Sequence, residues 1–133
     1  MYLMFLDTSF IIALEDADDQ NHNNAILYWR RFKKKPCKLV TTSYVFDETV
    51  TLLKKRLGFA KAAEVGKRLL ESSLVEMVHI SQEDFIKGWE MFLKHKDKGY
   101  SLTDCTSFLI MEKMCINEAL TFDEHFRQIG FRC

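Results

Sequence analysis

Short apolar runs alternate with longer amphipathic segments along this chain. The apolar run at residues 2–6 predicts a buried strand, and runs at 38–41, 74–80 and 119–122 predict three more. In the segments between them, apolar residues recur every three or four positions, which is the spacing of one face of a helix. Strands that alternate with helices favour a parallel sheet. The predicted fold class is therefore α/β with a mostly parallel central sheet.

The same periodicity predicts the helices that connect these strands. They cover residues 8–14, 22–35, 43–57, 59–72, 82–94, 103–114 and 124–129. Pro36 ends the second helix, because proline has no backbone N–H with which to continue it. The polar segment 15–24 predicts a solvated loop, and Phe131 predicts an added edge strand. With no internal repeat or linker, residues 1–133 are expected to form one domain.

Composition and charge narrow the functional classes. The 133 residues include 19 Lys plus Arg and 19 Asp plus Glu, so the chain has no net charge at neutral pH. A protein of this kind does not bind nucleic acid or anionic membrane through its overall charge. Any contact with nucleic acid must therefore be local.

The cysteines and the apolar runs indicate the cellular compartment in which the protein is expected. Cys37, Cys105, Cys115 and Cys133 have no Cys-x-x-Cys spacing and no paired histidines nearby, so no zinc or thioredoxin-like motif is present. They are expected to be reduced thiols. No apolar run approaches the roughly 20 residues that cross a bilayer. The expected location is cytoplasmic, with no membrane association.

Two aspartates directly follow predicted strands. Asp7 follows the first strand and Asp123 follows the fourth. Because the carboxyl ends of parallel strands line one crevice, these two side chains are expected to lie near each other. Either could instead be an ordinary N-cap of the helix that follows, since aspartate is a preferred cap.

Two more carboxylates lie beside apolar helix faces. Asp104 falls in the first turn of its helix, where it could simply favour the helix dipole. Glu48 falls on the side of its helix that carries the apolar residues, and a buried carboxylate needs compensation. Lys54 or Lys55 could pair with it only if Glu48 bends outward, because neither has the right helical spacing.

The helix cap, the helix dipole and the ion pair each explain one carboxylate alone and do not predict that all four lie together. A metal site does predict this. Mg²⁺ and Mn²⁺ prefer oxygen ligands, so a cluster of carboxylates is the expected ligand set. Such a site can activate water for attack on a phosphodiester. The residues therefore favour hydrolysis of a nucleic acid backbone.

Four segments in order resemble the motifs of the PIN-domain ribonucleases, a family that includes the toxin subunits of VapBC-type toxin–antitoxin pairs. The segments are residues 6–9 (LDTS), 42–48 (TSYVFDE), 100–108 (YSLTDCTSF) and 119–126 (ALTFDEHF), the last followed by Gly130 and Phe131. The resemblance covers nearly the whole chain. It implies a three-layer α/β/α sandwich, a divalent-metal endoribonuclease, a homodimer and a cognate antitoxin protein.

The resemblance also implies roles for individual residues. Asp7, Glu48, Asp104 and Asp123 would form an acidic quartet. The three aspartates would bind the metal, and Glu48 would hold or activate a water. Ser9 and Thr121 would support the site, and Asp97 is a further acidic candidate in a lysine-rich loop.

Several residues have open interpretations. The basic runs Arg30 to Lys38 and Lys54 to Arg56 could contact RNA phosphates or could be solvated helix ends. Tyr100 and Trp29 could stack on bases, although Trp29 falls on an apolar helix face. His125 closely follows Asp123 and could lie at the rim of the site, but it is expected on the surface of the last helix.

Two alternatives to a toxin nuclease stay open. A housekeeping RNA-processing nuclease of the same family would have no antitoxin. A binding module that keeps the fold without catalysis would have lost members of the acidic set, and the sequence retains all four. A phosphatase-like hydrolase is disfavoured, because it needs a second aspartate two residues after the first, where this chain has Ser9.

Overall fold

The computed structural model describes residues 2–35 and 37–133. The predicted helix end at Pro36 lies outside these residues, and the helix that precedes it already ends at Phe32. The elements in chain order are β1 (Tyr2–Leu6), α1 (Thr8–Glu15), α2 (His22–Phe32), β2 (Cys37–Thr42), α3 (Ser43–Leu57), α4 (Phe59–Glu71), β3 (Val75–Val78), α5 (Gln82–Lys94), α6 (Leu102–Lys113), β4 (Ala119–Leu120) and α7 (Glu124–Gln128).

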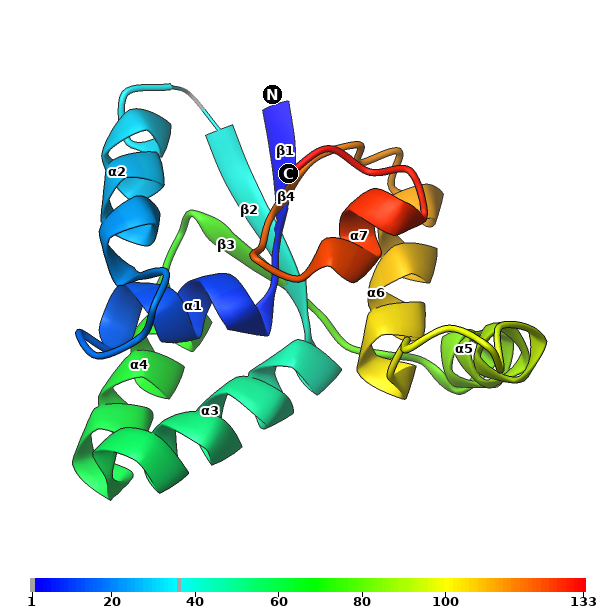
Figure 1. The fold of residues 1–133 in the computed structure, drawn as a ribbon, viewed down its shortest axis with the longest axis horizontal. Helices are drawn as coiled ribbons and strands as arrows, with labels where there is room; N and C mark the ends of the chain where they lie inside the picture. The colour runs from blue at the N-terminus through cyan, green and yellow to red at the C-terminus, as the bar shows by residue number, and fades with distance from the viewer. Residues whose placement is uncertain (1, 36) are drawn as a thin grey trace.

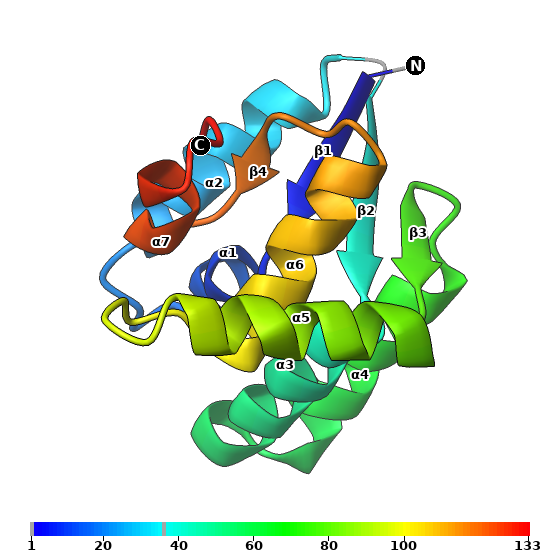
Figure 2. The same cartoon turned by 90° about the vertical axis from the view of Figure 1, so that its right-hand side faces the viewer.

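The strands form one parallel sheet in the order β3-β2-β1-β4. Phe5 of β1 lies beside Val40 of β2 on one side and Ala119 of β4 on the other. Figure 1 shows α1, α2 and α4 on one face of this sheet and α5, α6 and α7 on the other, and Figure 2 shows the second layer from its outer side. The predicted α/β/α sandwich with a parallel sheet is confirmed.

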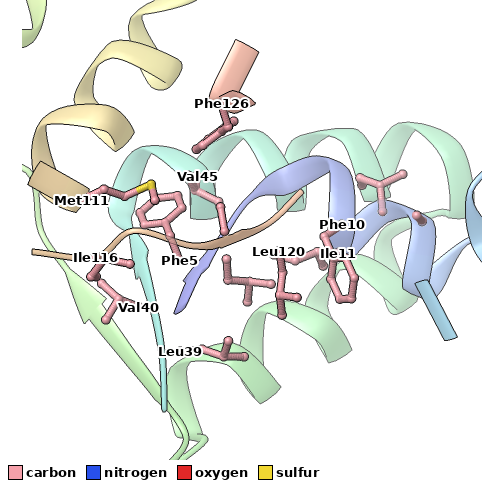
Figure 3. Close-up of a cluster of buried hydrophobic side chains, with 14 of the residues drawn as sticks. Phe5, Phe10, Ile11, Leu39, Val40, Val45, Met111, Ile116, Leu120 and Phe126 are labelled. Carbon is pink, nitrogen blue, oxygen red and sulfur yellow. The ribbon is translucent and has the colours of Figure 1, made fainter. Parts of the chain in front are cut away.

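Side chains that alternate along the strands supply both halves of the core (Figure 3). Phe5 points toward the layer of α6 and α7, where its ring centroid lies 6.0 Å from that of Phe126. Leu39 points the other way and lines a small apolar space with Phe10 and Val65, which belong to α1 and α4. Burial of such a side chain contributes about 1.5–3 kcal/mol. The sheet is therefore held from both faces.

A glycine sets the close packing of α5 on α6. A Cβ added at Gly88 would lie 2.6 Å from Cγ2 of Thr106. Thr106 is fully buried, and its hydroxyl donates to the carbonyls of Leu102 and Thr103, each at 3.0 Å. The Thr106 methyl therefore has no free direction in which to move. Asp84 adds an ion pair across the same interface, with its Oδ1 2.9 Å from Nζ of Lys113.

The end of the chain differs from the prediction. β4 has two residues, not the predicted four, because the Phe122 N–H leaves the sheet and donates to Ser9 Oγ at 2.9 Å. The predicted edge strand at Phe131 is shortened to one parallel bridge at the next residue, where the Arg132 N–H donates to the Asn117 carbonyl and the Ala119 N–H to the Arg132 carbonyl, both at 2.9 Å, while the Phe131 ring packs against Phe108. Among residues 2–35 and 37–133, this bridge between Glu118 and Arg132 is the one β-pairing outside the four strands.

The loop between α1 and α2 is shorter and more tightly bonded than a solvated segment. Asp16 is buried, and its Oδ1 accepts the N–H of Asp18 at 3.0 Å. The guanidinium of Arg56, in the last turn of α3, lies 3.6 Å from Asp16 and 3.3 Å from Asp19.

Within the described part of the chain, no helix is both long and apolar enough to cross a membrane.

Candidate active site

The carboxyl ends of the strands open into a cavity of about 540 Å³. All four carboxylates that the sequence singled out line it, together with Ser9. The lining includes Asp7, Ser9, Glu48, Asp104 and Asp123, and also Asp19, Arg56 and His125. The topology explains the convergence, because β1 and β4 are neighbours in the sheet and the helices that carry Glu48 and Asp104 begin at the same end.

Asp7 is the N-cap of α1 and is buried. Its Oδ2 accepts the hydroxyls of Ser9 and Thr121, both at 2.8 Å, and a longer bond of 3.4 Å from the Ser9 N–H. Burial raises the pKa of the Asp7 carboxyl, the two hydroxyls lower it, and the nearby charge of Asp123 raises it further. Asp7 is therefore both the N-cap that was the alternative interpretation and a member of the acidic cluster.

Ser9 and Thr121 also fix the backbone that leads to Asp123. The Thr121 hydroxyl accepts the N–H of Asp123 at 3.0 Å, and the Ser9 hydroxyl accepts the N–H of Phe122. Thr121 is buried behind the cavity, whereas Ser9 lines it. Both hydroxyls thus link Asp7 to the chain segment that carries Asp123.

Asp104 takes part in a capping box at the start of α6. The Ser101 hydroxyl accepts the Asp104 N–H at 2.9 Å, and Asp104 Oδ2 accepts the Ser101 N–H at 3.0 Å. Burial raises the pKa of Asp104, and the charges of Asp123 and Asp7 raise it further. The effect of those two carboxylates on Asp104 reflects how closely the three lie.

Glu48 reaches the cavity from the side of α3 and is half-buried. Burial raises the pKa of its carboxyl, and the Thr8 hydroxyl lowers this pKa. The charges of Asp104 and Asp123 raise it further. Glu48 forms no ion pair within residues 2–35 and 37–133. The predicted alternative of an outward pair with Lys54 or Lys55 is therefore absent.

His125 lies beside the acidic cluster and lines the cavity, so the expected surface position is wrong and the alternative position at the site is confirmed. Its Nδ1 lies 3.0 Å from Asp123 Oδ1 and 3.2 Å from Asp104 Oδ2. The Tyr100 ring packs edge-on against the imidazole, with centroids 5.3 Å apart. A Cβ added at Gly99 would approach Nε2 to 3.0 Å, so the glycine leaves room for the ring.

The sequence does carry one local signal for His125. It follows the strand-end Asp123 by two positions, in the first turn of α7, and its own N–H donates to Asp123 Oδ1 at 2.9 Å. A side chain in the first turn of a helix that Asp123 caps stays near that cap. The periodicity of so short a helix gave no comparable indication.

Three other candidates lie away from the cavity lining. Asp97 is exposed in the loop between α5 and α6. Tyr100 is only 7% exposed and packs on Phe108 as well as His125, so its ring is not free to stack on a base. Trp29 stacks on Phe32 with centroids 5.2 Å apart, as expected of an apolar helix face.

The donor set fits a divalent cation with oxygen ligands. One oxygen each from Asp104 and Asp123 and one nitrogen of His125 lie within 4.8 Å of one another. Asp7 and Glu48 line the same cavity, and the pKa values of Asp7, Glu48 and Asp104 are raised by burial. Carboxylates held together in this way repel one another, and a cation relieves the repulsion.

Comparison with known proteins agrees with this arrangement. The model of the PIN domain family matches residues 4–132. The 23S rRNA-specific endonuclease VapC20 of Mycobacterium tuberculosis, found in two strains, is 36% identical over 129 residues, which cover 97% of this chain and 95% of the relative. A VapC ribonuclease of Archaeoglobus fulgidus is 27% identical over 124 residues, 91% of this chain and 77% of that protein.

A solved structure supports the same conclusion for the fold. The crystal structure of Mycobacterium tuberculosis VapC20, a sarcin-ricin loop cleaving toxin, superposes with a TM-score of 0.88 at 34% identity, covering 96% of this chain and 95% of that one. The family match, the relatives and the sheet order all agree with the motifs in the sequence. The chain belongs to the PIN domain family.

Proposed function

We propose that this protein is a divalent-metal-dependent endoribonuclease and the toxin of a toxin–antitoxin pair. The observation that carries the proposal is the single cavity lined by Asp7, Glu48, Asp104 and Asp123. Relatives that match nearly the whole chain are VapC ribonucleases, and the one with a solved structure is a toxin. A binding module without catalysis is disfavoured, because the cavity retains every member of the acidic set.

In this proposal Asp7, Asp104 and Asp123 hold Mg²⁺ or Mn²⁺. The bound ion would supply charge neutralisation and a Lewis acid for the phosphodiester. Ser9 and Thr121 orient Asp7 through the 2.8 Å bonds that they donate. His125 keeps the carboxylates of Asp104 and Asp123 in register from its position between them.

Glu48 is the proposed general base. A water oxygen attacks phosphorus as its proton passes to the Glu48 carboxylate, the bond from phosphorus to the leaving oxygen breaks, and that oxygen takes a proton from solvent. Burial raises the pKa of Glu48 toward the working pH, which suits a group that must accept and then release a proton. Glu48 lines the cavity and forms no ion pair within residues 2–35 and 37–133, so its carboxylate can accept a proton from a water there.

The proposed substrate is 23S rRNA, cleaved in the sarcin-ricin loop. This proposal rests on the VapC20 relative, which is 36% identical over 129 residues covering 97% of this chain. We further propose a homodimer, for which the exposed side chains of Phe85, Ile86, Trp89 and Leu93 on α5 offer an apolar face. A cytoplasmic location is proposed on the basis of an RNA substrate and the free cysteines.

The decisive experiment incubates purified protein with bacterial ribosomes and with isolated 23S rRNA, in Mg²⁺, Mn²⁺ or EDTA. Primer extension then maps any cut. We expect a discrete cut that requires the metal and disappears in Asp7→Asn and Asp104→Asn. A cut that survives EDTA, or that persists in both variants, would overturn the proposed mechanism.

The antitoxin is tested separately. Expression of the wild type in a bacterial host should arrest growth, expression of Asp7→Asn should not, and co-expression of the neighbouring small open reading frame should relieve the arrest. Growth that is unaffected by a protein that cleaves RNA in vitro would favour the housekeeping nuclease instead.

A further inference from the structure

A second cavity, of about 420 Å³, lies between α2 and the strands β1 and β4. Its lining combines two tyrosines, Tyr2 and Tyr28, with two cations, Arg31 and Lys35. Tyr2 is 49% exposed and Tyr28 is 47% exposed, so both rings present a face to solvent. Exposed aromatic rings beside cations are the combination with which proteins hold single-stranded nucleic acid.

This cavity adjoins the acidic one through a pair of rings. Tyr28 lies against Phe122, with ring centroids 6.2 Å apart and planes tilted by 37°. Phe122 lines the acidic cavity, directly before Asp123, and Tyr28 lines the second cavity. Behind them Phe122 stacks on the buried Phe10, with centroids 5.8 Å apart, so the pair rests on the core. A strand of RNA that leaves the carboxylates on this side meets Tyr28 next.

The two cations of this cavity are free to bind a ligand. Arg31 and Lys35 are exposed and form no ion pair with any residue that the structure describes. Glu118 also lines the cavity, but it accepts the Tyr2 hydroxyl and lies 3.7 Å from the guanidinium of Arg132. The acidic group is therefore already partnered, and the excess charge of the cavity is positive.

We propose that Tyr28, Arg31 and Lys35 form a track for the single-stranded RNA that flanks the cleaved bond. Tyr28 stacks on a base, and Arg31 and Lys35 contact the following phosphates. The track gives a chain with no net charge the local cationic surface that binding of a polyanion requires. This inference rests on the proposed ribonuclease function.

The chain offers a matched control for the two cations. Arg30 and Lys34 lie in the same stretch, are exposed, and line neither cavity. The pair Arg31→Gln with Lys35→Gln and the pair Arg30→Gln with Lys34→Gln each remove two positive charges from the same surface. Any difference between them reports position and not overall charge.

The experiment measures binding of a labelled single-stranded oligouridylate of about 16 nucleotides. Asp7→Asn serves as the background, because it holds RNA without cutting it in the proposed mechanism. We expect Arg31→Gln/Lys35→Gln to weaken binding about tenfold and to reduce the slope of log affinity against log salt by about 1.4, or 0.7 for each lost phosphate contact. The control pair should change affinity less than twofold.

Tyr28 is tested by size and by aromatic character. Tyr28→Phe should keep RNA affinity, whereas Tyr28→Leu, which still covers Phe122, should weaken it about fivefold or more. In the catalytically active background, Tyr28→Leu and Arg31→Gln/Lys35→Gln should each raise KM for the RNA and leave kcat unchanged. Thermal melting that matches the wild type would show that each variant is folded.

The outcomes separate the track from the nuclease. The track is wrong if the two double substitutions of cations weaken binding equally, or if Tyr28→Leu binds RNA as well as Tyr28→Phe does. If the wild type still cleaves RNA in that case, the nuclease function stands. If the Arg31→Gln/Lys35→Gln protein binds RNA normally but loses its protein partner, the surface belongs to that partner and the track is again wrong. If the wild type neither binds nor cleaves any RNA, the proposed function fails first.

Discussion

The Thr121 hydroxyl donates a 2.8 Å hydrogen bond to Oδ2 of Asp7, although 114 positions separate the two residues in the chain. The same hydroxyl accepts the N–H of Asp123 at 3.0 Å. One buried side chain thus sets the distance between two carboxylates from different strands. A hydrogen bond to a charged group contributes about 1.5–3 kcal/mol, so we expect this contact to support both stability and the proposed activity.

Removal of that hydroxyl should therefore weaken the site. We expect Thr121→Val to lower kcat/KM for RNA about tenfold and to lower the free energy of unfolding by about 1–3 kcal/mol, because Asp7 loses a donor in a buried place. Cleavage assays and urea denaturation measure the two effects. Thr121→Ser keeps the hydroxyl and should retain activity near that of the wild type. Equal loss in both variants would show that the methyl group, not the hydroxyl, is what the site needs.

Asp7→Asn should abolish cleavage and yet stabilise the fold in EDTA. Burial raises the pKa of the Asp7 carboxyl in the folded protein. As the pH rises above the ordinary carboxyl range, the unfolded chain releases this proton first, so the stability of the folded protein falls until the raised pKa is passed and stays lower above it. Asparagine carries no charge and can still cap α1.

The pH dependence makes this prediction specific. The Tm of Asp7→Asn minus that of the wild type should be smallest at acidic pH, where both side chains are neutral, and should grow as the pH approaches neutrality. Melting curves at a series of pH values in EDTA measure the difference. Saturating Mg²⁺ or Mn²⁺ should stabilise the wild type alone. A difference that shrinks as the pH rises would contradict the buried-charge argument.

Gly88→Ala should destabilise the protein even though alanine is the better helix former. Alanine gains about 1 kcal/mol from helix propensity, but its methyl group would lie 2.6 Å from Cγ2 of the buried Thr106. Overpacking of this kind costs about 1–3 kcal/mol. Thr106→Ser removes that methyl group, so Gly88→Ala should be neutral or stabilising in a Thr106→Ser background. Chemical denaturation of the four proteins of this cycle measures the coupling, and additive effects would exclude the clash.

Asp97→Asn tests the acidic residue that the structure leaves outside the cavity lining. Because Asp97 is exposed in the loop before Tyr100, we expect cleavage rate and metal affinity to change by less than about twofold. Asp104→Asn, assayed beside it, should remove both. A large loss of activity in Asp97→Asn would mean that the loop closes over the substrate and carries Asp97 to it.

The acidic residues could be predicted because each depends on a local pattern. Asp7 and Asp123 directly follow strands, and the parallel order of β1 and β4 then brings them together. Glu48 follows from helical periodicity, because it shares a helix face with the buried Val45 and Thr49. The fold class and the acidic positions are thus written into short stretches of the chain.

The aromatic and imidazole groups could not be placed in this way, because their exposure depends on what packs over them. Tyr100 lies in a polar loop, yet Phe108 and His125 bury it. Helical periodicity did place Trp29 on the apolar face of α2, where it packs against the core, but it gave no sign that the neighbouring Tyr28 ring faces outward beside the site. One step along a helix turns a side chain by about 100°, and the sequence alone does not say which step meets the substrate.

β4 contributes only two residues to the sheet, and its pairing with β1 spans most of the chain. An edge strand this short has few ladder hydrogen bonds to hold it, so we expect this pairing to open before the pairing of β1 with β2. Its detachment would take Asp123 away from Asp7 while β1, β2 and β3 stay paired. Cleavage should therefore cease at a lower temperature than the one at which the helices melt, and amide exchange at Leu120 should be faster than at Val40.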